Sequence, residues 1–513
     1  MVLPSLRDPR LHLAAVIISI HVLGQIGLQF QVSVVQILAA ILTCAVIEVA
    51  ITLKQTGMVV WPASAMLTGS GVALIFRVNG TENGDYFSTR GWYLFAIVAG
   101  LALLSKYLIR FRGSHVFNPS NIGLVAAFIL LGSGRVEPLD FWWGPPGIWT
   151  VAAYTIILVG GALITVRLHL LAMSAAFWVA LAAGIGVLAA SGHCMTARWS
   201  AEPVCGAHFW VVILTSAELL VFLFFMITDP KTIPAGRVGR VVFAVGVGLV
   251  ATLLIAPQTT EFGAKVALLG ALTLMSVARL LFASRLPAPS SDEDRLGAFL
   301  SRLTGQVEGR PVARRAFFRG AVIGLAVVLL GTGVVAAGTS ARTPPVTPIA
   351  RAVPRVTVTV DPASLPRVTV DDRVARFSSH LAGSGAQELA ATLAENLEME
   401  ARALAASDSN LLTAVDSGAR FREMQTRIGD GVADGERVVD RYTFESLHLV
   451  PIASAEGQAS LRMGLEARGS VLETTSDTEG TVRSRHTSPF ALTFVLSQPY
   501  GTRWLLDDLR PLR

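Results

Sequence analysis

Long apolar runs recur along the first two thirds of this chain and constrain its fold more than any other feature. A helix needs about 20 mostly apolar residues to cross a bilayer. Eleven segments reach or approach that length and are predicted to span a membrane: residues 11–28, 33–52, 59–76, 91–109, 118–133, 148–166, 168–190, 208–227, 241–256, 264–283 and 320–338. The third, fifth and ninth are short, which indicates tilted, broken or re-entrant helices.

The composition supports this assignment and excludes other classes. Charged residues make up 15% of the chain, against about 25% in soluble domains, and the mean hydropathy is +0.57. A wholly soluble enzyme, a disordered chain and a nucleic-acid-binding protein are therefore poor interpretations. The basic residues lie in short loops between apolar runs, which is typical of the charges that orient a membrane protein in the bilayer. The expected partner is therefore the lipid bilayer and not nucleic acid.

The distribution of basic residues predicts the orientation. With the N-terminus placed inside, eighteen Lys and Arg residues fall in inner loops and five in outer loops. This excess follows the positive-inside rule. An odd number of spans then places residues 339–513 outside, so we expect a multi-pass plasma-membrane protein with a cytoplasmic N-terminus and an extracytoplasmic C-terminal domain. The outer basic residues are Arg77, Arg90, Arg135, Arg198 and Lys265.

Two cysteines share one loop that this topology places in an oxidising compartment. Cys194 and Cys205 are separated by ten residues, and disulfides persist in such a compartment. The alternatives are two unpaired thiols or a metal pair assisted by His193 and His208. Cys44 lies inside a span and is expected to be a small core residue.

Composition shifts divide the chain into five parts. Residues 1–284 form the membrane domain, and residues 285–319 form a cytoplasmic basic linker that contains a short amphipathic segment. The eleventh span covers residues 320–338, and residues 339–354 form a Pro/Thr-rich linker. Residues 355–513 are predicted to form an extracytoplasmic α+β domain.

The C-terminal part carries helical and then strand patterns. Short strands are expected near 356–370, a helical period covers 386–428, and four alternating segments follow, namely RYTFESLHLV, ASLRMGLEA, FALTFVLS and TRWLLDD. Helices followed by a strand meander indicate an α+β domain. The pattern resembles an NTF2-like cone, in which helices pack on a curved sheet.

Ionisable residues within spans are expensive in a bilayer and become functional hypotheses. Glu48 and Glu218 lie near the ends of their spans, where a paired structural role competes with a role toward a substrate. His21 lies on an apolar face, which favours a hydrogen-bonded packing residue. No catalytic triad, Walker loop, zinc-binding HExxH motif or dinucleotide-binding motif occurs in the sequence, so no catalytic residue is assigned.

Two turns combine helix ends with basic residues. Asn118-Pro119-Ser120-Asn121 has the pattern of a helix N-terminus, with an Asn cap and Pro in the first turn. Such an end attracts anions, and Lys106 precedes it. Thr228-Asp229-Pro230 ends a later span and precedes Lys231. Spacing alone favours ordinary caps at both turns.

These two stretches resemble the RnfD/NqrB family, the membrane subunits of Rnf-type electron-transport complexes and of the sodium-pumping NADH:quinone reductase. The matching residues are Ser105-Lys106 followed by Phe117-Asn118-Pro119-Ser120, and the stretch FFMITDP at 224–230. SAMLTGSGVAL at 64–74 is similar to the small-residue third span of that family. The likeness covers about residues 5–285. A further, more general likeness is to membrane proteins found with enediyne biosynthesis genes.

The resemblance implies a fold class and a cofactor. It implies an all-α polytopic bundle of ten helices with an inverted repeat, to which this chain adds one span and the C-terminal α+β domain. Some family members attach FMN to the Thr of an S-G-A-T-type motif, but here the corresponding loop has no Thr before Thr150. This argues against covalent FMN and leaves a non-covalent flavin, FMN or riboflavin, with Trp142 and Trp143 either stacking on it or forming an interfacial aromatic belt.

Three functions are compatible with the sequence. The first is the membrane subunit of a flavin- or quinone-linked electron-transport system, partnered by other redox subunits. The second is a small-solute channel or carrier on the same scaffold. The third is a membrane anchor whose C-terminal domain binds a ligand or an extracytoplasmic protein.

The residues expected to bind a cofactor belong to the two turns and to the preceding basic loop. We expect the turns to converge on the inner side, as equivalent elements of two repeats, and to form a site for an anionic group. The predicted cofactor-binding residues are Lys106, Asn118, Pro119, Asn121, Thr228, Asp229 and Pro230; the sequence predicts no metal ligands.

Overall fold

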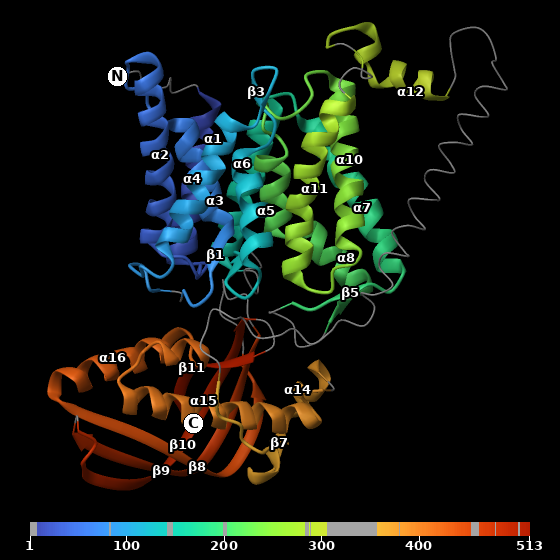
Figure 1. Ribbon diagram of the computed structural model, residues 1–513. Coiled ribbons are helices and arrows are strands. Elements are labelled where there is room, and N and C mark those ends of the chain that lie inside the picture. Colours follow the sequence, from blue (N-terminus) through green and yellow to red (C-terminus); the bar gives the residue numbers. More distant parts are fainter. Residues whose placement is uncertain are drawn as a thin grey trace.

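A computed structural model describes most of the chain, and two parts are visible in Figure 1: a helical bundle up to residue 282 and a sheet domain from residue 356. The described residues are 8–81, 84–140, 147–197, 203–282, 287, 289–304, 356–378, 380–452, 461–477, 479–500 and 503–512. The expected eleventh span, the Pro/Thr-rich linker, most of the basic linker, and Trp142 and Trp143 lie outside this part.

The bundle contains five helices that are long and apolar enough to cross a membrane: α2 (Val34–Thr56), α6 (Ile148–Arg167), α7 (Leu171–Ala190), α10 (Arg237–Ile255) and α11 (Glu261–Phe282). A sixth candidate is the bent unit of α8 (Gly206–Thr215), α9 (Ala217–Val221) and the π-helix η1 (Phe222–Met226). Shorter apolar helices are α1 (Pro9–Ile26), α3 (Ala63–Ile75), α4 (Trp92–Leu108) and α5 (Pro119–Leu131). These helices make the chain a membrane-embedded protein.

The shortness expected for the third and fifth spans is confirmed, and both continue as strands. Helices α3 and α5 have 13 residues each, and the strands that follow them, β1 (Phe76–Val78) and β4 (Val136–Pro138), pair antiparallel. This pairing satisfies backbone groups that a broken helix leaves open within the bundle. The ninth span was predicted short, which is wrong, because α10 begins at Arg237 and has 19 residues.

The eighth segment breaks where the sequence shows only an apolar run. Ser216 adopts an extended conformation between α8 and α9, and its hydroxyl accepts a hydrogen bond from the amide of Leu219 at 3.2 Å. The two halves meet at a bend of 41°. A single serine that caps a new helix is enough to start it in a different direction.

Small residues allow the helices around α3 and α5 to pack closely. A Cβ at Gly69 of α3 would lie 2.5 Å from the carbonyl oxygen of Ala40 in α2, and one at Gly123 of α5 would lie 2.5 Å from Cβ of Ala102 in α4. Close approach through glycine is typical of helix pairs in membranes. It brings the starts of α3 and α5 next to the end of α4.

The bundle has two distinct ends in Figure 1. We call the end that carries the hairpin of β2 (Arg110–Phe111) and β3 (Ser114–His115) the basic face. The opposite end, the disulfide face, carries β1, β4 and the hairpin of β5 (Cys194–Met195) and β6 (Val204–Cys205).

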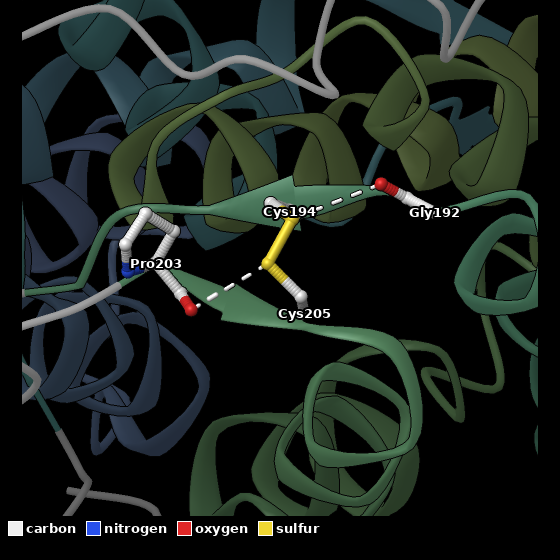
Figure 2. The surroundings of a disulfide bond; sticks show 4 residues. All are labelled: Gly192, Cys194, Pro203 and Cys205. Atoms are coloured by element: carbon white, nitrogen blue, oxygen red, sulfur yellow. Dashed lines mark hydrogen bonds between the residues drawn. A yellow bond between two sulfur atoms is a disulfide. The ribbon is translucent and has the colours of Figure 1, made fainter.

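The predicted disulfide is confirmed. Cys194 and Cys205 face each other across β5 and β6 and are bonded, with their Cα atoms 4.2 Å apart (Figure 2). The hairpin also contacts the start of α11, because the carbonyl of Thr196 accepts a hydrogen bond from the amide of Glu261 at 2.9 Å. Cys44 is a buried free thiol, as expected.

The part of the basic linker that the structure describes is attached to α10. The Asp294 carboxylate accepts hydrogen bonds from the amides of Arg237 and Val238, both at 2.9 Å. Asp294 therefore caps α10 from outside the helix. The short helix α12 (Leu296–Thr304) follows directly.

The C-terminal domain is α+β, as predicted. Its five-stranded sheet has the order β11-β10-β9-β8-β7, and its helices are α14 (Asp372–Phe377), α15 (Ser384–Ala406) and α16 (Gly418–Asp434). The four long strands pair antiparallel: β8 (Glu436–Pro451), β9 (Arg462–Asp477), β10 (Val482–Tyr500) and β11 (Arg503–Pro511). Of the expected early strands, β7 (Val368–Val370) forms; residues 356–360 have no strand structure, and Val356 and Val358 pack against the cluster that contains Met399 of α15.

Helix α15 covers one face of this sheet. Its apolar residues Leu389, Leu393 and Leu397 share one buried cluster with Leu449 and Leu465 of the sheet. A second interaction lies between the helices, where Arg420 of α16 and Glu400 of α15 form a buried ion pair at 2.7 Å. The domain therefore has its own core.

Candidate functional site: a cavity at the basic face

A cavity of about 720 Å³ opens among α1, α3, α4, α5, α6 and η1. This volume lies within the range of pockets that hold cofactors and drug-sized ligands, roughly 300–1,000 Å³. Charged and polar groups line one part of it, including Arg10, Lys106, Arg110, His115, Asn118, Asp229 and Lys231. Apolar side chains line the rest, including Leu13, Ile17, Leu67, Leu74, Ile164, Leu168, Val221, Phe224 and Phe225.

Six of the seven predicted cofactor-binding residues line this cavity. They are Lys106, Asn118, Pro119, Thr228, Asp229 and Pro230. The seventh, Asn121, is 1% exposed and points elsewhere: its amide donates to the carbonyl of Leu269 at 3.0 Å and to the hydroxyl of Thr273 at 2.8 Å. Asn121 thus ties α5 to α11 and does not reach the cavity.

The two predicted turns meet at the mouth of the cavity. His115 Nε2 lies 3.5 Å from Asp229 Oδ2, and the side-chain amide of Asn118 donates to the carbonyl of Met226 at 3.2 Å. The oxygen of the same Asn118 amide accepts from the backbone N–H of Asn121, so Asn118 caps α5 as predicted. One side chain therefore fixes the helix start and joins it to the second turn.

The prediction that the two turns are equivalent elements of two repeats is wrong. Asn118 begins the fifth helical segment, whereas Thr228 follows the eighth, after η1. Equivalent elements of two repeats would both begin, or both end, the corresponding helices. The turns meet because α5 begins, and η1 ends, at the basic face, and because the hairpin that carries His115 directly precedes α5.

The second turn follows a π-helix. Helix η1 covers Phe222–Met226, and the Thr228 hydroxyl donates to the carbonyl of Phe224. π-helical turns are rare and occur often at functional sites. Here the wider turn lies beside the cavity, into which Phe224 and Phe225 project.

Two of the basic side chains that line the cavity form ion pairs with carboxylates. Arg10 pairs with Asp8 at 2.7 Å, and Lys106 pairs with Glu48 at 3.1 Å. For Arg110 and Lys231 the structure shows no ion pair with any described residue; the Arg110 guanidinium instead donates to the carbonyl of Gly113. Asp229 also lines the mouth, so four basic side chains (Arg10, Lys106, Arg110 and Lys231) face three carboxylates (Asp8, Glu48 and Asp229), and one net positive charge remains.

The sequence left two roles open for Glu48, a paired structural role and a role toward a substrate, and the Lys106–Glu48 pair decides between them. Glu48 has the paired role, because it also accepts a hydrogen bond from the Tyr107 hydroxyl, and Lys106 lies 3.5 Å from the Ser64 hydroxyl. Tyr107, Ser64 and His115 line the cavity but were not predicted. The roles of Tyr107 and Ser64 depend on α2, α3 and α4 lying side by side, and that of His115 depends on its hairpin meeting Asp229; no spacing along the chain encodes either arrangement.

A second charged cluster lies toward the disulfide face. Lys265 Nζ is 2.9 Å from Glu218, 2.7 Å from Glu261 and 3.5 Å from Asp140. Glu218, like Glu48, therefore has the paired role. The three carboxylates surround one ammonium group that joins α9, α11 and the end of β4.

Comparison with known proteins adds nothing to the family resemblance. No protein-family model matches the chain, and no curated protein matches it. The site is therefore characterised by its own geometry: a mouth with excess positive charge, a capped helix start, and an apolar interior.

Proposed function

We propose that the membrane domain binds a planar, amphiphilic anion in this cavity without a covalent bond, as a flavin- or quinone-linked subunit of an electron-transport system. The observation that carries the proposal is the division of the cavity into a cationic mouth and an apolar, partly aromatic interior. A flavin nucleotide has the matching division, with a phosphate at one end and a flat ring at the other.

Specific residues would hold such a molecule. Arg110 and Lys231 have charge available for a phosphate or carboxylate, and the backbone N–H of Ser120, in the first turn of α5, forms no bond to a described backbone carbonyl. Amides at a helix start favour an anion. Tyr107, Phe224 and Phe225 supply ring faces along the wall. When bound, the cofactor would supply the electron transfer, and the protein would hold and orient it.

The bundle supports a second candidate function, a small-solute carrier. Broken helices at membrane depth are typical of transporters, where they line a binding site. The break between α8 and α9 and the change from α3 to β1 are two such features. Under this reading the same cavity, which Ile75 at the end of α3 lines, binds the solute, whereas Ser216 at the other break does not line it. The ten-helix inverted repeat implied by the family resemblance would provide the scaffold. The topology, with the basic face cytoplasmic, remains part of the proposal.

The absorption spectrum of the detergent-purified protein separates these candidates. A non-covalent flavin gives visible absorption that passes into the filtrate after denaturation and ultrafiltration. Colour that stays on the denatured chain would contradict the non-covalent assignment. A colourless protein that takes up neither FMN nor riboflavin would contradict the flavin proposal and leave the quinone-linked subunit and the carrier as candidates.

A further inference from the structure

The described part of the basic linker includes α12, whose apolar residues follow the period of a helix. Its sequence, LGAFLSRLT, has Leu or Phe at positions 296, 299, 300 and 303 and small or polar residues at the others. This spacing places the apolar residues along one side of the helix. The amphipathic segment predicted from the sequence is therefore a helix with one apolar side.

The bundle does not bury the apolar side of α12. Helix α12 contacts α10, but Leu296 is 39% exposed and Phe299 is only partly buried. Ala298, which lies on the opposite side of the helix, is exposed as well. Leu296 and Ala298 therefore both face the surroundings of the protein, although they lie on different sides of α12. An exposed apolar side of this kind is typical of a surface that meets a membrane or another protein.

The position of α12 favours the membrane. The Asp294 carboxylate caps α10 at the amides of Arg237 and Val238, and α12 begins two residues after Asp294. Helix α10 is a candidate membrane span. Arg237 and Arg240 in its first turn mark the level of the lipid headgroups, because basic side chains at the ends of spans reach the interface. From that level α12 extends sideways, across the direction of the spans (Figure 1).

The charge of the linker complements an anionic lipid surface. Residues 285–319 contain seven Arg and four Asp or Glu, a net charge of +3, and one of those carboxylates, Asp294, is bound to the α10 amides. Arg295 precedes α12 with 78% of its side chain exposed, and its pair with Asp292 at 3.7 Å is exposed and weak. Basic residues beside an amphipathic helix are attracted to anionic headgroups.

We propose that α12 lies along the membrane surface at the basic face, with its apolar side inserted among anionic lipids. Acyl chains then cover Leu296 and Phe299, and headgroups meet Arg295. Through the Asp294 cap, the inserted helix holds the start of α10 at the level of the headgroups. This inference concerns the outside of the bundle and is independent of the ligand proposed for the cavity.

Fluorescent labelling of two exposed positions tests this placement. In a Cys44→Ala background, Leu296→Cys and Ala298→Cys each provide one reactive thiol, because Cys194 and Cys205 are bonded to each other. The full-length protein is labelled with the fluorophore NBD and reconstituted in nanodiscs of phosphatidylcholine and phosphatidylglycerol. We expect the label at position 296 to emit at a shorter wavelength than the label at position 298. We also expect lipids with a nitroxide on the acyl chain to quench the label at position 296 more strongly.

The two positions are a matched pair, because both side chains are exposed in the protein. If α12 lies in water, both labels emit as they do in water, and that result would overturn the proposal. A label at position 296 that emits at a shorter wavelength but is not quenched by the nitroxide lipid is covered by protein, which would overturn the proposal as well. In nanodiscs of phosphatidylcholine alone, the difference between the two labels is expected to shrink, and a difference of the same size would overturn the role of anionic lipid.

Discussion

At the scale of single residues, the Arg420–Glu400 pair is a deeply buried ion pair of the C-terminal domain. The two side chains are 2% and 3% exposed and share two hydrogen bonds, at 2.8 and 2.7 Å. Burial alone lowers the pKa of Arg420, but the Glu400 carboxylate outweighs it and holds that pKa above its usual value. Breaking the pair leaves a charge buried without compensation.

We therefore predict that Arg420→Ala destabilises the domain by about 3–5 kcal/mol. Hydrogen exchange of the α15 and α16 amides in the full-length protein measures the loss. Arg373→Ala is the matched control, because its pair with Asp371 is exposed on the Arg373 side and is expected to change stability little. A small effect of Arg420→Ala, similar to the control, would contradict this account.

Asp294 gives a prediction with a defined pH dependence. Its burial raises its pKa, but hydrogen bonds from the amides of Val238 and Arg237 outweigh this and lower the pKa below 3.8. A carboxyl whose pKa is lowered on folding stabilises the attachment above its unfolded pKa and loses that contribution as the pH falls through the folded pKa.

We predict that the attachment of the segment around Asp294 weakens progressively as the pH falls below 3.8 toward the lowered pKa, and that Asp294→Asn weakens the attachment at neutral pH by about 1–2 kcal/mol. Trypsin cleavage after Arg295 at neutral pH measures this, and the variant should be cleaved faster than the wild type. Asp292→Asn is the control, because the Asp292 side chain is 97% exposed. Equal cleavage rates of the wild type, Asp294→Asn and Asp292→Asn would contradict the capping role of Asp294.

At the scale of elements, the disulfide holds the hairpin that precedes α8. We predict that Cys194→Ser lowers the unfolding temperature of the membrane domain, by an amount that corresponds to about 2–3 kcal/mol for so short a loop. Reductant should lower the wild-type value similarly and leave the variant unchanged. Equal thiol labelling of the denatured wild-type protein, with and without reductant, would show that the bond is absent.

The elements also show what the sequence predicts and what it does not. Apolar length predicted the helices, and the Asn-Pro turn predicted the start of α5, because both signals are local. The bend at Ser216 and the π-helix η1 were not predicted, because they lie inside an apolar run that has the same composition on both sides. The Lys106–Glu48 pair was not predicted either, because it depends on which helices become neighbours.

At the scale of the whole molecule, the basic residues predict a direction of insertion. By the positive-inside rule, we expect the basic face in the cytoplasm and residues 339–513 outside. We predict that a phosphatase reporter fused after Arg513, which is active only outside the cytoplasm, is active. A green fluorescent protein fused at the same position should remain dark. The reverse pattern would overturn the orientation and place the cavity mouth on the outer side.

The central claim is that the joined turns at the cavity mouth bind an anion, and FMN-induced thermal stabilisation tests it most directly. The measurement compares Asn118→Ala with Ser33→Ala, because Ser33 caps α2 as Asn118 caps α5 but does not line the cavity. Losing either cap is expected to cost about 1 kcal/mol. We predict that FMN raises the unfolding temperature of the wild type and of Ser33→Ala, and not that of Asn118→Ala. An undiminished FMN effect in Asn118→Ala would contradict the account.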